Sequence, residues 1–123
     1  MERVAKYALV VLFILLVYCP ASARSERDYA EAWCAGQGGI TEVLMPAGTR
    51  CDCLTNTHAV EVERAAKWAE SIGQALHYAE QSERRAGVAL IMGVRDERFW
   101  ERLLGVIQEE RLPIDVWIIE EEE

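Results

Sequence analysis

Acidic side chains recur in the middle of the chain at spacings that could bind a metal ion. Asp52 lies in one segment of strand-like composition, and Glu61 and Glu63 lie two apart in the next. Because successive side chains of a strand alternate between faces, both glutamates are expected on one face of a sheet. If the short connection at residues 55–57 pairs the two strands, all three carboxylates can converge. Carboxylate oxygens suit Mg²⁺ or Mn²⁺, which can activate water and stabilise charge on a phosphate.

A line of polar side chains follows on the next predicted helix. Lys67, Gln74 and Tyr78 are separated by seven and by four residues, which places them close to one line along a helix. The adjacent stripe is apolar and is typical of a helix face that packs on a sheet; it consists of Trp68, Ile72, Ala75 and Ala79. The polar line therefore borders the buried stripe, where it could form one edge of an active-site cleft.

The elements that must position these residues follow from hydrophobic period and turn signals. Helical patterns cover residues 27–35, 64–81 and 96–110, and strand patterns cover residues 40–45, 50–54, 58–62, 87–92 and 114–119. The first three strands are joined by short turns, whereas the last strands alternate with helices and favour parallel pairing. The order predicts an α/β fold with a mixed central sheet flanked by helices: an αβββαβ core followed by a further helix and strand.

This order and these residues resemble the PD-(D/E)XK nuclease superfamily over roughly residues 27–92, most of the predicted mature chain. Asp52 looks like the acidic residue of the superfamily's second strand, and Glu61 looks like the glutamate that opens its third-strand E-x-K signature. Gln74 and Tyr78 are similar to a Q-x-x-x-Y element on the next helix of some subfamilies. Some members add a glutamate from the first helix, for which Glu31 is a weaker candidate.

One position departs from that signature, because Glu63 stands where the lysine is expected. In this respect the chain resembles variants in which the lysine has migrated to the helix, and Lys67 is then its counterpart. An ammonium group one turn past the strand can point back toward the carboxylates and orient the attacking water.

The resemblance implies a restriction-endonuclease-like fold and metal-dependent hydrolysis of phosphodiester bonds, with DNA as the expected substrate. Asp52 and Glu61 would bind Mg²⁺ or Mn²⁺ with help from Glu63, so that these carboxylates and Lys67 form the catalytic set. Lys67 would orient the water or stabilise the transition state. Substrate would be positioned by Gln74 and Tyr78.

The alternative is a catalytically inactive nuclease-fold domain that binds a basic partner in the cell envelope. Without residues 1–23 the chain carries 11 basic and 20 acidic side chains, a balance that repels polyanions unless divalent cations or a local basic strip outweighs it. Arg84 and Arg85, with Arg64 and Lys67, form the one candidate strip. A separate alternative assigns these residues no site: Asp52, Glu61 and Glu63 are then solvated charges on the outward face of an antiparallel sheet, and Lys67 with Glu63 is an ordinary surface pair.

Histidine and tryptophan residues are less informative in the sequence. His58 precedes Glu61 by three residues, and a turn histidine with backbone partners is favoured over a residue at the edge of the site; His77 is expected on the helix surface. The four tryptophans are interpreted as packing anchors rather than base-stacking platforms; they are Trp33, Trp68, Trp100 and Trp117.

The first 23 residues have the pattern of a signal peptide. Arg3 and Lys6 precede an uncharged apolar run over residues 7–18, and a small-residue triplet at residues 21–23 predicts cleavage before Arg24. The run is short for a membrane span of about 20 residues, so an uncleaved anchor is the less favoured alternative. We therefore expect a periplasmic or extracellular protein without stable membrane association, with one domain over residues 24–119 and a solvated acidic tail over residues 120–123.

Export would place the remaining cysteines where disulfides can form. Cys51 and Cys53 are two apart in a predicted strand and are expected on the same side, so either could pair with Cys34 and leave one thiol. A zinc site is a weaker match to this spacing.

Overall fold

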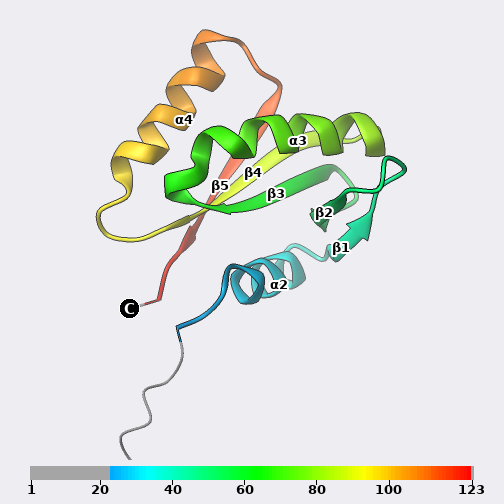
Figure 1. Ribbon diagram of the computed structural model, residues 1–123, viewed down its shortest axis with the longest axis horizontal. Coiled ribbons are helices and arrows are strands. Elements are labelled where there is room, and N and C mark those ends of the chain that lie inside the picture. Colours follow the sequence, from blue (N-terminus) through cyan, green and yellow to red (C-terminus); the bar gives the residue numbers. More distant parts are fainter. Residues whose placement is uncertain (1–22, 123) are drawn as a thin grey trace, which may run out of the picture.

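The computed structural model describes residues 23–122, and the predicted signal peptide lies, apart from Ala23, outside this range. The described chain folds into a five-stranded mixed sheet with helices on both faces (Figure 1), which confirms the predicted α/β class. Between residues 23 and 122, no helix is both long enough and apolar enough to cross a bilayer.

The elements follow the predicted order. They are α2 (Glu26–Gly36), β1 (Ile40–Leu44), β2 (Arg50–Leu54), β3 (His58–Arg64), the 3-10 turn η1 (Ala65–Lys67), α3 (Trp68–Ser82), β4 (Arg85–Met92), α4 (Glu97–Glu109) and β5 (Ile114–Glu120). The sheet order is β1-β2-β3-β4-β5. The first two pairings are antiparallel, and the pairings of β4 with β3 and with β5 are parallel.

Two hydrophobic layers hold the sheet between its helices. On the α2 face, Tyr29 packs with Val60 and Val62 of β3. On the opposite face, α3 and α4 cover Val88 and Leu90 of β4. Because parallel strands covered on both faces have no solvent side, β4 is a continuous apolar run rather than an alternating one.

Two element boundaries differ from the sequence expectation in ways that affect the site. The strand predicted to end at residue 62 continues to Arg64, and the chain then enters η1 before α3 begins. Helix α2 begins at Glu26 because Ser25 and Asp28 form a reciprocal capping box. As a result, Glu63 lies within a regular strand and Glu26 lies in the first helical turn.

The predicted solvated tail is partly held against the fold. Glu120 is the last residue of β5, and the Glu121 carboxylate forms an ion pair of 3.0 Å with Arg64. Glu122 forms an ion pair of 2.8 Å with Arg24. These two arginines provide opposite charges for carboxylates that the sequence leaves without an evident partner.

Candidate functional site

Strands β2 and β3 separate where the predicted site begins. Their register ends at the pair formed by Cys53 and Val60. One residue further along β2, Asp52 Oδ2 accepts a hydrogen bond of 2.8 Å from the backbone N–H of Val62. A side-chain carboxylate therefore takes a backbone donor at the point where the regular pairing stops, and the carboxyl group of Asp52 is held between the two strands.

The neighbouring strand is distorted at the same level. Glu42 of β1 lies opposite Asp52 but is left out of the β1–β2 register, and its φ of 54° is in the left-handed region. Such a conformation costs a non-glycine residue about 1–3 kcal/mol and is often found near functional sites. The strained residue lies next to the carboxylate cluster, as is expected where a site requires one particular backbone geometry.

Glu61 is the most deeply buried carboxylate of the cluster. Its side chain projects from β3, the residue is 3% exposed, and its Oε2 atom is buried without a hydrogen-bond partner in the described part of the chain. Burial is the main reason that the pKa of Glu61 rises to about 10, and the charge of Asp52 and a hydrogen bond between the two carboxyl groups raise it further. Burial also raises the pKa of Asp52. At neutral pH this pair must hold either a proton or a cation.

Glu63 lies two residues further along β3 and is 6% exposed. Burial raises its pKa to about 7; a hydrogen bond from the Arg64 N–H opposes this shift, Glu26 adds to it, and Lys67 opposes it. Glu61 and Glu63 share a face of β3, as their spacing predicts. The structure therefore brings three of the predicted site residues together: Asp52, Glu61 and Glu63.

The first helix contributes a different carboxylate from the one considered in the sequence. Glu31 is exposed, and its carboxylate lies 3.7 Å from Arg27 in an ion pair on the helix surface. Glu26 instead lies near the cluster, where its charge raises the pKa values of Asp52, Glu61 and Glu63. The capping pattern Ser25-x-x-Asp28 could have revealed Glu26, because it moves the start of the helix by one residue.

Lys67 ends η1, directly before α3. Its side chain is exposed, and it forms no ion pair within residues 23–122, although its charge lowers the pKa of Glu63. The turn η1 thus brings the ammonium group into electrostatic range of the carboxylates but not into contact with them.

Gln74 and Tyr78 connect the cluster to the surface of α3. The Tyr78 hydroxyl donates a hydrogen bond of 3.1 Å to Gln74 Oε1. Gln74 is exposed, whereas Tyr78 is 6% exposed. Burial raises the pKa of Tyr78 above its usual range, and the charges of Glu61 and then Asp52 add to the shift. The phenol therefore lies beside the buried carboxyl pair.

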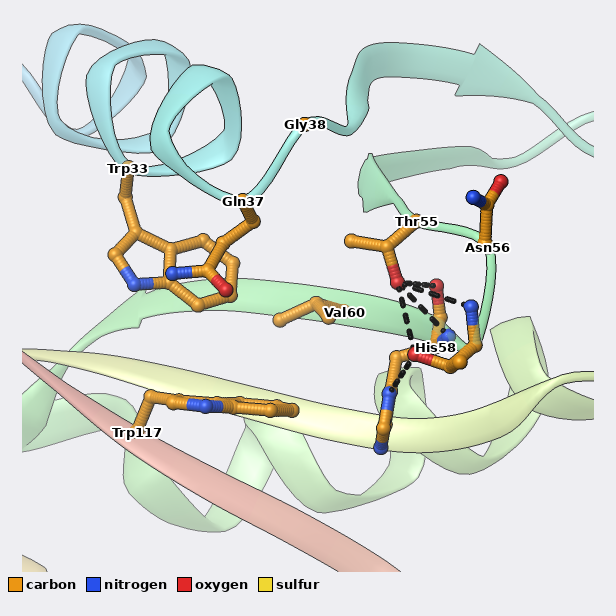
Figure 2. A pocket seen from close by; sticks show the side chains of 9 residues that line it. Trp33, Gln37, Gly38, Thr55, Asn56, His58, Val60 and Trp117 are labelled. Carbon is orange, nitrogen blue, oxygen red and sulfur yellow. Dashed lines mark hydrogen bonds between the residues drawn. The ribbon is translucent and has the colours of Figure 1, made fainter.

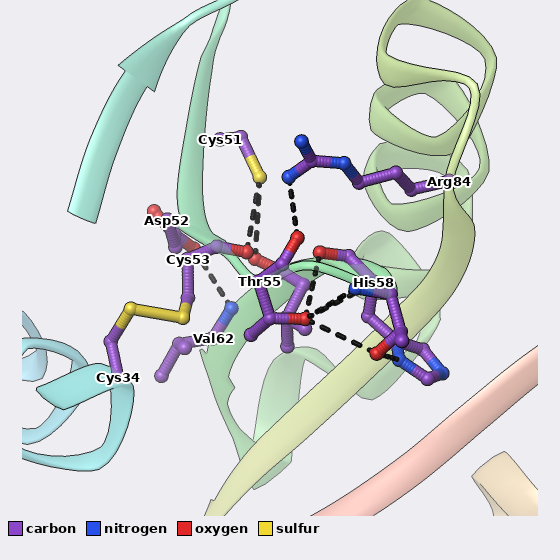
Figure 3. Close-up of a disulfide and its surroundings, with 10 residues drawn as sticks. Cys34, Cys51, Asp52, Cys53, Thr55, His58, Val62 and Arg84 are labelled. Atoms are coloured by element: carbon purple, nitrogen blue, oxygen red, sulfur yellow. Dashed lines mark hydrogen bonds between the residues drawn. A yellow bond between two sulfur atoms is a disulfide. The ribbon is translucent and has the colours of Figure 1, made fainter. Parts of the chain in front are cut away.

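The cysteines next to Asp52 are not equivalent. Cys53 is bonded to Cys34 with a Cα–Cα distance of 5.6 Å. This disulfide is one of the two pairings that the sequence left open. Because both sulfurs are bonded, neither can bind zinc. Cys51 is a buried free thiol that donates to the carbonyl oxygens of Cys53 and Val60 (Figure 3). The expectation that Cys51 and Cys53 share one side of β2 is not met.

The reason lies in the irregular strand. Cys53 packs in the α2-side core, whereas Cys51 packs with Met45, Ala59 and Tyr78 on the other side. The two cysteines flank Asp52, whose pairing with the strained residue Glu42 is missing from the β1–β2 register. Burial raises the pKa of the Cys51 thiol to about 11, so Cys51 is a packed, unreactive thiol beside the site.

The acidic cluster offers a two-carboxylate anchor for a divalent cation rather than a complete cage. Within residues 23–122, no three His, Cys, Asp or Glu side chains are arranged as a ready set of metal ligands. Mg²⁺ keeps several waters and commonly uses one or two carboxylates. The donor set fits such an ion: Asp52 and Glu61 are in contact, and Glu61 Oε2 has no partner in the part of the chain that the structure describes.

No protein-family model, curated protein or solved structure was found to match this chain. The functional argument therefore depends on the geometry of the site.

Proposed function

We propose that this protein is an exported, Mg²⁺- or Mn²⁺-dependent nuclease that hydrolyses phosphodiester bonds in DNA. The observation that carries the proposal is the buried Glu61 carboxyl, whose Oε2 has no hydrogen-bond partner among residues 23–122 while the group contacts Asp52. A buried polar atom without a partner typically costs about 1–3 kcal/mol. Coordination of a cation would remove that cost and would allow both carboxylates to ionise.

Each residue of the cluster has a defined task in this proposal. Asp52 and Glu61 would hold the ion, and Glu63, which titrates at about 7, would assist and accept a proton from the attacking water. A bound divalent ion supplies an activated water and stabilises negative charge on phosphate. Lys67 would approach the charged phosphate from the solvent side. The hydrogen-bonded pair Gln74 and Tyr78 would position the substrate.

Three further observations support the proposal. The described element order contains the αβββαβ arrangement that the resemblance implies, with the acidic residues on its second and third strands. The disulfide between Cys34 and Cys53 is compatible with an oxidising, extracytoplasmic compartment. A cation in the cluster would also offset part of the formal net charge of −8, which otherwise repels a polyanion.

The test is nicking of supercoiled plasmid by the purified protein with Mg²⁺ or Mn²⁺. We expect cleavage that EDTA abolishes, and a loss of at least about 100-fold in Asp52→Asn and Glu61→Gln, in line with the removal of an essential electrostatic group. Glu31→Gln is the matched control, because Glu31 is an exposed carboxylate outside the cluster. Cleavage that persists in both cluster variants would remove these residues from the reaction.

A second candidate is a nuclease-fold domain that binds a cation without cleaving nucleic acid. It is favoured by the position of Lys67, which is exposed and, within the described range, forms no ion pair with the carboxylates. Calorimetry that shows Mg²⁺ or Mn²⁺ binding by a protein that does not nick plasmid would support this candidate over the nuclease.

A further inference from the structure

A pocket of about 230 Å³ lies away from the carboxylate cluster, between the end of α2, the turn after β2, and β5 (Figure 2). Its apolar walls are Trp33, Trp117 and Val60, and Gln37, Asn56 and His58 also line it. Pockets for drug-sized ligands usually measure about 300–1,000 Å³. This one is smaller, so it suits a single ring whose remaining substituents lie outside.

The two tryptophans form a wedge. Trp33 comes from α2 and Trp117 from β5; their ring centroids are 5.5 Å apart and their planes differ by 57°. A flat ring could stack on one indole while its edge meets the other, which is a favoured aromatic arrangement. Such a wedge selects a flat ring rather than a flexible chain.

The Trp117 side of the pocket is rigidly supported. The His58 ring contacts the Trp117 ring edge to face at 5.1 Å, His58 Nε2 lies 2.6 Å from Asp115, and His58 Nδ1 lies 2.7 Å from Thr57 Oγ1. Hydrogen bonds from Arg85 and then from His58 lower the pKa of Asp115 to about 2, which keeps this anchor charged at neutral pH. Both imidazole nitrogens are occupied, so His58 acts as a support for Trp117.

The rim of the pocket provides amides and no charge. Gln37 and Asn56 are exposed, and an amide side chain both donates and accepts hydrogen bonds. Among residues 23–122, His58 is the one ionisable side chain that lines the pocket, and both of its ring nitrogens already have partners in Thr57 and Asp115. The complementary ligand is a neutral flat ring with donors and acceptors on its edge, which describes a nucleobase.

A positive charge lies at the turn that carries Thr55 and Asn56. The Arg84 guanidinium donates to the carbonyl oxygen of Thr55, which lines the pocket. Within residues 23–122 Arg84 forms no ion pair, whereas its neighbour Arg85 is paired with Asp115 at 2.8 Å. This uncompensated cation favours a nucleotide, with its phosphate, over a neutral sugar.

We infer that the pocket binds an unpaired nucleotide of single-stranded DNA, with the base against Trp33 and Trp117 and the phosphate near Arg84. This inference rests on the proposed function, because it names the form of nucleic acid that the nuclease would engage. Val60 lines the pocket and the next residue, Glu61, points to the opposite face of β3. The strand would thus bind on one face of the sheet and reach the carboxylates around its edge.

The experiment is fluorescence anisotropy of a short labelled oligothymidylate, titrated with the full chain in EDTA at low salt. Wild-type protein should bind it and prefer it over a duplex of the same length. Trp33→Leu should weaken binding about 10-fold, since stacking of a base on an aromatic side chain contributes about 1–3 kcal/mol. Asn56→Ala should weaken binding several-fold. Because Asn56 is exposed, this variant should fold like the wild-type protein. Trp100→Leu is the matched control, a half-buried tryptophan outside this pocket, and should bind normally.

The outcomes separate this inference from the proposed function. Glu61→Gln should lose cleavage yet keep oligothymidylate binding. Unchanged binding in both Trp33→Leu and Asn56→Ala, or a preference for duplex, would overturn the pocket assignment and leave the nuclease proposal standing. Pocket-dependent binding by a wild-type protein that never cleaves would refute the nuclease and retain the nucleotide site. Displacement of the probe by methyl glucoside would show a sugar site and contradict the inference.

Discussion

At the scale of single residues, the burial of Glu61 dominates the chemistry of the site. A carboxylate with a pKa of about 10 binds a proton in the folded state at pH values where the unfolded chain, with its value near 4.5, has released it. The folded state therefore binds more protons than the unfolded state between these two values. Stability is greatest at the lower end of this window and is lost as the pH rises through it.

The direction of this effect predicts how the stability of the cation-free protein depends on pH. In EDTA, the free energy of unfolding should fall as the pH rises from about 5 to about 9. The unfolded chain releases the protons of Glu61 and Glu63 near pH 4.5, whereas the folded protein keeps the proton of Glu63 up to about pH 7 and that of Glu61 up to about pH 10. Urea denaturation at a series of pH values measures this slope. Glu61→Gln should flatten the slope, and a slope of the opposite sign would contradict the buried, unpaired state of this carboxyl.

The cysteine assignments can be tested on the intact fold. Because the Cys51 thiol is buried and its pKa is about 11, iodoacetamide at pH 8 should leave it unmodified in the folded protein and should alkylate it in urea. Peptide mapping without reduction should recover Cys34 linked to Cys53. A recovered link between Cys34 and Cys51 would show that the side-chain arrangement around Asp52 is different.

At the scale of elements, the disulfide ties α2 to β2 directly beside Asp52. It closes a loop with a sequence separation of 19 residues and thereby holds Glu26 of α2 near the carboxylates. The bond stabilises the fold chiefly by restricting the unfolded chain. It also fixes the strand that carries Asp52, so it should influence both stability and activity.

We expect the double variant Cys34→Ser, Cys53→Ser to lose about 3 kcal/mol of unfolding free energy, the magnitude typical of a loop of this length. Urea denaturation of oxidised wild-type protein and of the variant gives this difference. Cys51→Ser serves as the control for the loss of a sulfur that is not bonded. An equally stable double variant would show that the bond does not constrain the chain as described.

Most elements could be predicted from the sequence because their periods are clear: β2 was expected over residues 50–54 and is observed there, and the remaining ends differ by at most a few residues. The details of the site, in contrast, could not be predicted from the sequence. The positive φ of Glu42 and the opposite placements of Cys51 and Cys53 arise from an irregular strand that no alternation pattern encodes. The aromatic pocket depends on Trp33 and Trp117, which the fold brings together from distant parts of the chain.

At the scale of the whole molecule, the sheet separates two surfaces with different chemistry. The carboxylates of β2 and β3 lie near α3, whereas the pocket of Trp33 and Trp117 lies on the α2 side. A chain with a formal net charge of −8 can engage a polyanion only where local features offset the charge. On one surface a bound cation would offset the charge. On the other, the Arg84 guanidinium would offset it and aromatic stacking would add binding energy.

Calorimetric titration of the protein with Mn²⁺ tests the central claim, that Asp52 and Glu61 together hold a divalent cation. The account predicts one ion per chain, an affinity that rises between pH 6 and pH 8 as protons are displaced from the cluster, and loss of binding in Asp52→Asn and Glu61→Gln but not in Glu31→Gln. Binding that is absent from the wild-type protein, or equally strong in both cluster variants, would contradict it.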